Sequence, residues 1–453
     1  MVSRPTFTTL LAGAVVGVYL LVVAGATATI ADAAAACGGW PLCDGSLTAS
    51  TAIALGHRAL AAVVGLLVVA TAVVGWRDTT RRVRGALAVA IALYPVQVAV
   101  GGLVATGASV PGLHLLVATG IFASLTLALA WHLEAETGTD DTGEVPDRDL
   151  PPIEEGPKAP MPTGLARAKA TAWAYFQLMK PRLMWLLALV ASAGMALAAG
   201  PGLPIDTVVA TLGGGVLAIG ASGTFNHVLE RDVDQRMERT SDRPLATYQV
   251  PVKNAVVFGL SLAALSLVAF LQVNTLAAVL GLVAIVFYSV IYTLVLKPNT
   301  VQNTVIGGAA GALPALIGWA AVTGEIGVPG LALAGVIFLW TPAHFYNLAL
   351  AYKEDYAKGG FPMMPVVRGE TETRKHVLLH LGATLLGASA LAAVTDLGWL
   401  YGATTVSLGA VFLWTVIRLH HERDEGAAFR AFHASNAYLG LLLLAIVVDS
   451  LAV

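Results

Sequence analysis

The chain has 453 residues, of which 57% are hydrophobic and 12% are charged, and its mean hydropathy is +0.76. Soluble globular domains carry about 25% charged residues, so this composition excludes an ordinary soluble enzyme. The formal net charge of -2 offers no basic excess to neutralise phosphates, so nucleic acid is excluded as an expected partner.

Apolar runs long enough to cross about 30 Å of hydrocarbon recur along the chain. They lack the period-two alternation of a membrane β-barrel, so the sequence predicts an all-α integral membrane protein surrounded by membrane lipid. We expect a four-helix transmembrane domain at 1–133, an acidic cytoplasmic linker at 134–170 and a nine-helix bundle at 171–453. The thirteen predicted spans are 8–28, 51–75, 85–107, 113–133, 183–200, 206–226, 253–273, 276–296, 303–323, 327–350, 378–396, 399–418 and 433–453.

The arginines of the short loops predict the orientation, because cytoplasmic loops carry an excess of Lys and Arg. Four arginines lie at 77–84 after the second span, whereas the loop 29–50 has neither Lys nor Arg. We therefore expect a multi-pass protein of the cell membrane with a cytoplasmic N-terminus, and an odd number of spans places the C-terminus outside. As an alternative, the first span resembles a cleaved secretory signal, since small residues follow it at 31–36.

The segment 134–160 interrupts the apolar pattern. Nine of the 28 acidic residues fall in it, interleaved with Gly and Pro. Such a segment has little apolar surface to bury, so we expect a flexible, solvated linker between two membrane domains.

The most informative polar stretch is FNHVLERDVDQRMERTSDRPL at 225–245. Asn226, Glu230 and Asp234 are spaced by four, so on a helix they lie on one face. Clustered oxygen ligands of this kind bind Mg²⁺, which completes its shell with water and phosphate oxygens. Arg239 and Arg243 follow closely and suit a diphosphate group. The alternative is a positive cytoplasmic loop whose charges pair with one another.

A second acidic loop follows a later span, within HFYNLALAYKEDYAKGGFPMMPVV at 344–367. Lys353 and Asp355 lie in it, and we expect the loop on the same membrane face as the first. Two acidic loops on one face can hold a diphosphate from both sides. Lys297 begins a further loop on this face and is either a diphosphate contact or an anchor at the membrane surface.

These motifs resemble the UbiA-type intramembrane prenyltransferases, whose N-x-x-x-D-x-x-x-D pattern is read here as Asn226, Glu230 and Asp234. Within that superfamily the likeness is greatest to the heme O synthases, or protoheme IX farnesyltransferases. Glu230 departs from the pattern, because most members have Asp at that position. The other matching pieces, in chain order, are LMKPRLMWLL at 178–187, YTLVLKPNTVQNTVIGGAAGALPALIGW at 292–319, HFYNLALAYKEDY at 344–356 and PMMPVV at 362–367.

The resemblance implies a UbiA-type bundle that transfers farnesyl from farnesyl diphosphate to a vinyl group of heme B, giving heme O in heme A biosynthesis. It implies heme A synthase or a terminal oxidase assembly as partners. A quinone precursor or lipid acceptor, or a non-enzymatic transporter, are the alternatives. The implied residues are Asn226, Glu230, Asp234 and Asp355 for catalysis and Mg²⁺, and Arg239, Arg243, Lys297 and Lys353 for the diphosphate.

The first domain contains two histidines near the predicted outer membrane face. His57 and His114 lie at similar depth on alternate spans, and imidazole is a common axial ligand of heme iron. Cys37 and Cys43 lie in an outer loop, where oxidation can join them. With CGGWPLCDG, GHR and QVAVGGLVATG, this domain resembles the N-terminal half of heme A synthase, which implies bound heme B. Ala54 replaces an expected acidic residue, so the resemblance favours heme binding or delivery over heme oxidation.

Overall fold

The computed structural model describes residues 4–30, 37, 39–43, 46–139, 141, 143–146 and 163–452. Within these ranges every regular element is helical, and thirteen helices are long and apolar enough to cross a membrane. The predicted all-α integral membrane class is therefore confirmed. About half of the predicted linker, and the small residues at 31–36 that resemble the end of a signal, lie outside the described residues.

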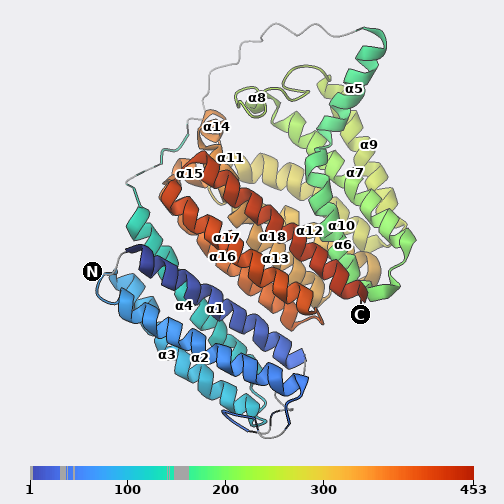
Figure 1. The fold of residues 1–453 in the computed structure, drawn as a ribbon. Helices are drawn as coiled ribbons and strands as arrows, with labels where there is room; N and C mark the ends of the chain where they lie inside the picture. Colours follow the sequence, from blue (N-terminus) through green and yellow to red (C-terminus); the bar gives the residue numbers. More distant parts are fainter. Residues whose placement is uncertain are drawn as a thin grey trace.

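Helices α1 to α4 pack side by side at one edge of the molecule (Figure 1). Thr48 and Thr80 cap the second and third of them, since each hydroxyl accepts a hydrogen bond from a backbone N–H of the first turn. The fourth continues to Thr137, so Glu134 and Glu136 lie on a helix and not in the linker. The bounds are α1 Arg4–Ile30, α2 Ala49–Gly75, α3 Arg81–Ala105 and α4 Pro111–Thr137.

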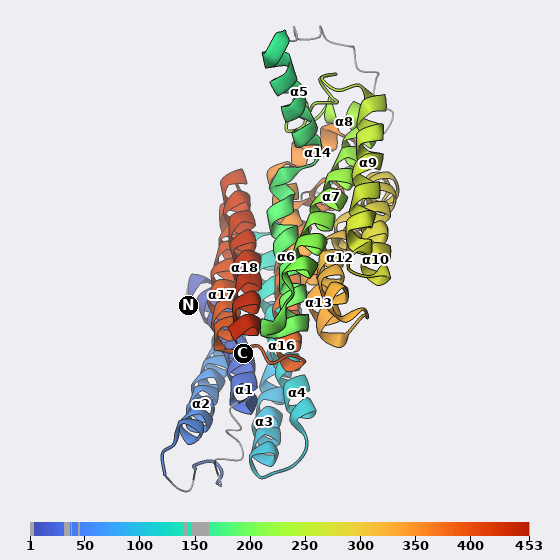
Figure 2. The same cartoon turned by 90° about the vertical axis from the view of Figure 1, so that its right-hand side faces the viewer.

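The rest of the described chain forms a second bundle, with short helices in its loops. Three of these short helices, α8, α14 and α15, lie at one end of the bundle, which we name the loop face, and α5 projects beyond it (Figures 1 and 2). The long elements are α5 Gly164–Leu178, α6 Pro181–Ala199, α7 Ile205–Leu229, α9 Val252–Leu271, α10 Thr275–Val286, η2 Phe287–Leu296, α12 Asn303–Thr323, α13 Val328–Ala351, α16 Gly369–Ala393, α17 Trp399–Glu422 and α18 Glu425–Ala452. The short ones are η1 Gly200–Gly202, α8 Arg231–Asp234, α11 Lys297–Asn299, α14 Lys353–Lys358 and α15 Met364–Val367.

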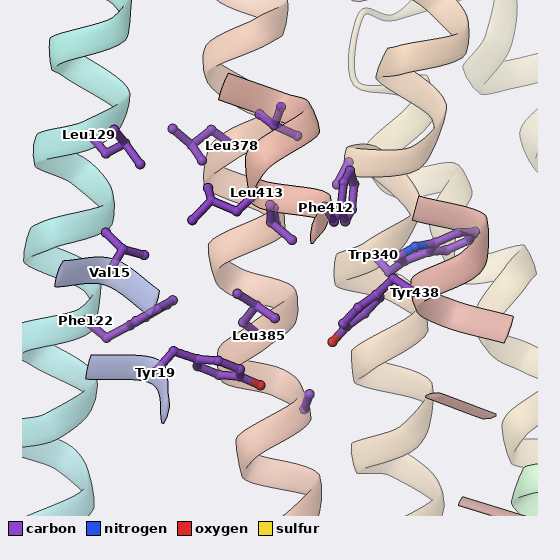
Figure 3. Packing of buried hydrophobic residues seen from close by; sticks show 14 of the residues in the cluster. Val15, Tyr19, Phe122, Leu129, Trp340, Leu378, Leu385, Phe412, Leu413 and Tyr438 are labelled. Atoms are coloured by element: carbon purple, nitrogen blue, oxygen red, sulfur yellow. The ribbon is translucent and has the colours of Figure 1, made fainter. Parts of the chain in front are cut away.

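One hydrophobic core joins the two bundles. It runs from α1 and α4 into α16, α17, α13 and α18, and Figure 3 shows Tyr19 and Phe122 of the first bundle facing Leu385 of the second. Polar contacts add to the packing: the Tyr19 hydroxyl lies 3.0 Å from the Thr405 hydroxyl, and Lys375 donates to Glu134 at 2.7 Å. The two bundles are therefore packed against each other.

The part of the linker that is described is docked on the second bundle. Asp141 accepts hydrogen bonds from the backbone N–H of Glu370 and, at 3.0 Å, from the Thr371 hydroxyl, both in the first turn of α16. An acidic side chain at a helix N-terminus satisfies free N–H groups and the helix dipole. The predicted solvated segment is thus anchored at Asp141, because α16 offers N–H groups there that its own turns leave without an acceptor.

Helices α6 and α12, which flank the second bundle's cavity described below, approach each other through glycine. A Cβ on Gly318 would lie 2.1 Å from the carbonyl oxygen of Ala191, and one on Gly194 would lie 2.5 Å from that of Ala315. Small residues let membrane helices pack closely where no difference in hydrophobicity drives them together. Gly307 of α12 likewise allows a close contact with η2, since a Cβ there would lie 2.6 Å from the Tyr292 ring.

Replacing Gly318 by alanine should separate α6 from α12, because the clash is with backbone. We expect Gly318→Ala to destabilise the protein by about 1–3 kcal/mol, as overpacking does in well-packed cores. Thermal unfolding of the purified protein in detergent measures the effect. Gly335→Ala is the matched control, because nothing lies within 4 Å of its Cβ position. Equal melting temperatures for the two variants would contradict the packing argument.

Candidate active site

The first acidic loop begins where α7 ends at the loop face. Asn226 lies in the last turn of α7, and the helical hydrogen bonds continue past it: the N–H of Glu230 donates to Asn226 at 2.9 Å, and that of Asp234 donates to Glu230 at 2.7 Å. The spacing of four is therefore retained through the loop. All three residues are buried, with 2%, 5% and 2% of their surface exposed.

Each of these three oxygen-bearing side chains has a basic partner. Nη1 of Arg243 donates to the two carboxylate oxygens of Asp234 at 2.7 and 2.8 Å, and Nζ of Lys297 donates to Oε1 of Glu230 at 2.6 Å. Nζ of Lys180 donates to Oδ1 of Asn226. The charges are paired, as the alternative reading of this loop expected, but the pairs are buried together at the loop face.

Burial and the neighbouring charges shift the pKa values of the residues in this cluster in different directions. Burial alone would raise the pKa of Glu230, but the positive charges of Lys297 and Lys180 outweigh it and lower that pKa. For Asp234, burial outweighs the attraction of Arg243 and raises the pKa. Burial, with repulsion from Arg243, lowers the pKa of Lys180 to about 7. Each carboxylate thus depends on its basic neighbour for its charge.

Lys180, which immediately precedes α6, lies inside the cluster. Its backbone has φ 54°, a left-handed conformation that costs a residue other than Gly about 1–2 kcal/mol. Besides Asn226, its ammonium donates to the Tyr288 hydroxyl at 3.2 Å. The turn between α5 and α6 therefore directs this side chain toward the first acidic loop.

The element η2 is a π-helix, which sequence periodicity did not indicate. Its wider turn lets the Thr293 hydroxyl donate to the carbonyl of Tyr288 at 2.8 Å and accept from Nδ2 of Asn226 at 3.1 Å. These bonds fix the amide of Asn226 with its oxygen toward Lys180. Single stretches of π-helix occur often at functional sites. The sequence reading assigned no role to Thr293.

The second acidic loop supports the first through its backbone. Asp355 accepts from the N–H groups of Glu238 and Arg239, at 2.6 and 3.3 Å. The guanidinium of Arg239 lies over the rings of Tyr352 and Tyr356, 5.2 and 5.6 Å from their centroids. The two loops meet as expected, but both oxygens of Asp355 bind backbone donors instead of facing Asn226 and Glu230.

Only some of the other basic residues predicted to bind the diphosphate lie in the cluster. Lys297 lies in the cluster and also 4.1 Å from the centroid of the Phe361 ring. Lys353 is not part of it, because its ammonium pairs with Glu370 of α16 at 3.0 Å. The structure therefore brings together Arg243 and Lys297, places Arg239 at the joint between the loops and leaves Lys353 apart.

An apolar cavity extends from Lys180 and Tyr288 into the second bundle. Its walls come from α6, α7, α9, α10 and α12, and they include Leu187, Val216, Ile219, Phe270 and Ile317. The polar cluster thus lies at the mouth of an apolar chamber, an arrangement that suits a molecule with a charged head and an apolar tail.

The donor set at the mouth fits Mg²⁺. Among the described residues no three His, Cys, Asp or Glu side chains converge on one point. Mg²⁺ is ordinarily held by one or two carboxylates together with substrate phosphates. Glu230 and Asp234, with the amide oxygen of Asn226, supply that number and kind of ligand.

In the first bundle, Nδ1 of His57 and Nδ1 of His114 are buried and have no hydrogen-bond partner among the described residues. Nε2 of His114 lies 3.1 Å from Nε2 of Gln97, the first residue of the motif QVAVGGLVATG, to which the sequence reading assigned no role. Cys37 and Cys43 are joined by a disulfide.

A family model described as the UbiA prenyltransferase family matches residues 186–442. Protoheme IX farnesyltransferase 1 of Natronomonas pharaonis is 70% identical, with 99% of each chain covered, and the protoheme IX farnesyltransferase of Haloarcula marismortui is 65% identical, with 100% of each covered. A solved structure of digeranylgeranylglyceryl phosphate synthase has a similar fold, with a TM-score of 0.54 and 15% identity over 63% of this chain and 100% of that one. Because the family model matches more than half of the chain and the relatives span nearly all of it, the chain belongs to the UbiA prenyltransferase family.

Proposed function

We propose that the protein is a heme O synthase, which transfers farnesyl from farnesyl diphosphate to a vinyl group of heme B. The observation that carries the proposal is the cluster of Asn226, Glu230 and Asp234 with three basic side chains at the mouth of the apolar cavity. The names of the relatives from Natronomonas pharaonis and Haloarcula marismortui support farnesyl as the group and protoheme IX as the acceptor.

Different residues have different roles in this reaction. When the bond between C1 of the farnesyl group and diphosphate oxygen breaks, negative charge develops on the leaving group, and Arg243 and Lys297 are fixed where they stabilise it. Mg²⁺ held by Asn226, Glu230 and Asp234 would neutralise the same charge. The apolar walls hold the chain and exclude water from the allylic cation. The ring of Tyr288 lines the cavity at its mouth, where its face suits a cation.

We propose that the loop face is cytoplasmic and that the protein lies in the cell membrane with its C-terminus outside. The arginines that follow α2 and the loop basic residues support this orientation. Farnesyl diphosphate then reaches the polar cluster from the cytoplasm while its tail enters the bundle. Heme A synthase or a terminal oxidase assembly is the proposed partner that takes up the product.

We also propose that the first bundle binds heme B through His57 and His114, as the resemblance to heme A synthase implies. The buried, unpartnered Nδ1 atoms of these two half-buried histidines support the proposal, because a buried polar atom ordinarily has a partner. Gly25 and Gly101 let the two rings approach closely, since a Cβ at these positions would lie 3.5 Å from Cε1 of His57 and 3.0 Å from Cε1 of His114. The interaction of His114 with Gln97 fixes one edge of its ring.

The catalytic proposal predicts the effect of removing one charge from the cluster. Glu230→Gln and Asp234→Asn should each lower heme O formation about 10²–10³-fold, the usual cost of losing one group that stabilises charge in a transition state. Purified protein is incubated with heme B, farnesyl diphosphate and Mg²⁺, and the pigment is identified by mass. Glu238→Gln is the control, because that carboxylate is exposed and pairs with the ammonium of Lys358, which is also exposed. Near-normal product from both cluster variants would remove the proposed role.

Asp355 gives a separate prediction, because its carboxylate holds the backbone of the first loop. Asp355→Ala leaves two part-buried N–H groups without this acceptor, at a cost of roughly 1 kcal/mol each. We expect faster tryptic cleavage within 227–252. Glu354→Ala is the control, since Glu354 is the exposed neighbour. A cleavage rate unchanged from wild type would show that Asp355 does not hold the loop.

The heme proposal for the first bundle is tested by absorbance. In the full chain, His57→Ala with His114→Ala should abolish the low-spin spectrum of heme held by two histidines in protein purified without added heme, because both axial ligands are lost, whereas heme B bound only as substrate lacks this ligand pair. Heme O formation should persist, since the polar cluster is untouched. His433→Ala, which removes an exposed histidine, should leave the spectrum unchanged. A retained low-spin spectrum in the double variant would show that these histidines are not the ligands.

A further inference from the structure

Every side chain of the proposed metal site is already engaged by a basic group. Arg243 holds both oxygens of Asp234, and Lys297 holds one oxygen of Glu230. Lys180 donates to the amide oxygen of Asn226. A cation can therefore coordinate these oxygens only where the basic side chains turn away from them or share them.

Turning away is costly when nothing replaces the lost partner. The side chains of Glu230 and Lys297 are 7% and 11% exposed, and those of Asp234 and Arg243 are 3% and 20% exposed. Breaking a buried ion pair leaves an uncompensated charge, which is strongly unfavourable in a low dielectric. A divalent cation alone would also bring further positive charge to a site that already holds two paired cations and Lys180.

A diphosphate removes this obstacle because it offers the basic groups a new anion. Guanidinium and ammonium groups form strong charge-assisted hydrogen bonds with phosphate oxygens. When Lys297 and Arg243 pass from carboxylate to phosphate, Glu230 and Asp234 become available to the cation. The cation itself prefers a few carboxylates together with phosphate oxygens, so every charge keeps a partner.

Aromatic rings lie beside two of the basic groups. The ammonium of Lys297 lies 4.1 Å from the centroid of the Phe361 ring, and that of Lys180 lies 5.5 Å from the centroid of the Tyr288 ring. A cation over an aromatic face is attracted to it. These rings keep both ammonium groups at the cavity mouth when their oxygen partners change.

We infer that Lys297, Arg243 and Lys180 make metal binding and diphosphate binding depend on each other, so that the metal binds weakly alone and tightly together with the diphosphate. The inference rests on the proposed function and describes how the metal and the substrate bind at the same site. Such coupling is reciprocal, and a coupling of typical size changes affinity by about 5–150-fold. A cation would then accumulate in the site only when a substrate head group is present.

Titration with Mn²⁺, followed by electron paramagnetic resonance, tests the inference on the purified full chain with and without inorganic pyrophosphate. We expect wild-type protein to bind Mn²⁺ at least about 10-fold more tightly with pyrophosphate. Lys297→Met frees Glu230, so it should bind Mn²⁺ alone more tightly than wild type and gain less from pyrophosphate. The same titration in protein-free buffer measures the complex of Mn²⁺ with pyrophosphate in solution, and the affinity of the protein is taken from the Mn²⁺ that this complex leaves free.

Two controls separate this effect from a change in fold or in overall charge. Lys353→Met removes a lysine that pairs with Glu370 outside the cluster, and it should titrate like wild type. Lys297→Arg keeps a cation on Glu230 and should also retain the coupling. Thermal unfolding of each variant shows whether it is folded.

Two outcomes overturn the inference: tight Mn²⁺ binding by wild type without pyrophosphate, or Lys297→Met titrating like wild type. Heme O formation by the same wild-type preparation tests the proposed function separately. If heme O forms but the metal binds tightly alone, the coupling is refuted while the proposed function stands. Absence of product with every prenyl diphosphate tried removes the proposed function, whatever the titration gives.

Discussion

The pairing of Glu230 and Asp234 with Lys297 and Arg243 is the interaction on which the rest of the candidate site depends. These carboxylates lie at the end of a membrane helix, where an unpaired charge is strongly unfavourable. Each partner comes from a different part of the chain, since Lys297 follows η2 and Arg243 lies later in the first loop. The same contacts that compensate charge therefore also draw the loop over the cavity mouth.

The spans and the spacing of Asn226, Glu230 and Asp234 could be predicted because both depend on local pattern. A helix that crosses the hydrocarbon core of the membrane needs a long apolar run. Side chains spaced by four residues lie on one face because of helix geometry. The role of Asp355 could not be predicted, because a carboxylate that binds backbone N–H groups has no sequence signature. Thr293 was missed for a related reason: a π-helical turn differs from an α-helical one by one residue in its hydrogen bonds, and apolar composition is the same in both.

The contact between the two bundles also could not be predicted from the sequence. In a soluble protein an apolar face marks an interface, but in a membrane the lipid-facing and protein-facing surfaces are equally apolar. Tyr19 and Phe122 therefore could not be told from lipid-exposed residues, although both are buried in the core shared with α16 and α17. Charge patterning separated the acidic segment from its neighbours, yet it did not indicate that Asp141 binds the start of α16.

The arrangement of the bundles leaves the cavity accessible to its substrate. The first bundle packs on α16 and α17, whereas the cavity is lined by α6, α7, α9, α10 and α12. Figure 2 shows these lining helices gathered on the side of the second bundle away from α1 and α2. An isoprenoid tail that dissolves in the membrane can thus approach its chamber without crossing the first bundle. Because the shared core runs through α16 and α17, the first bundle packs on the second without covering the helices that line the cavity.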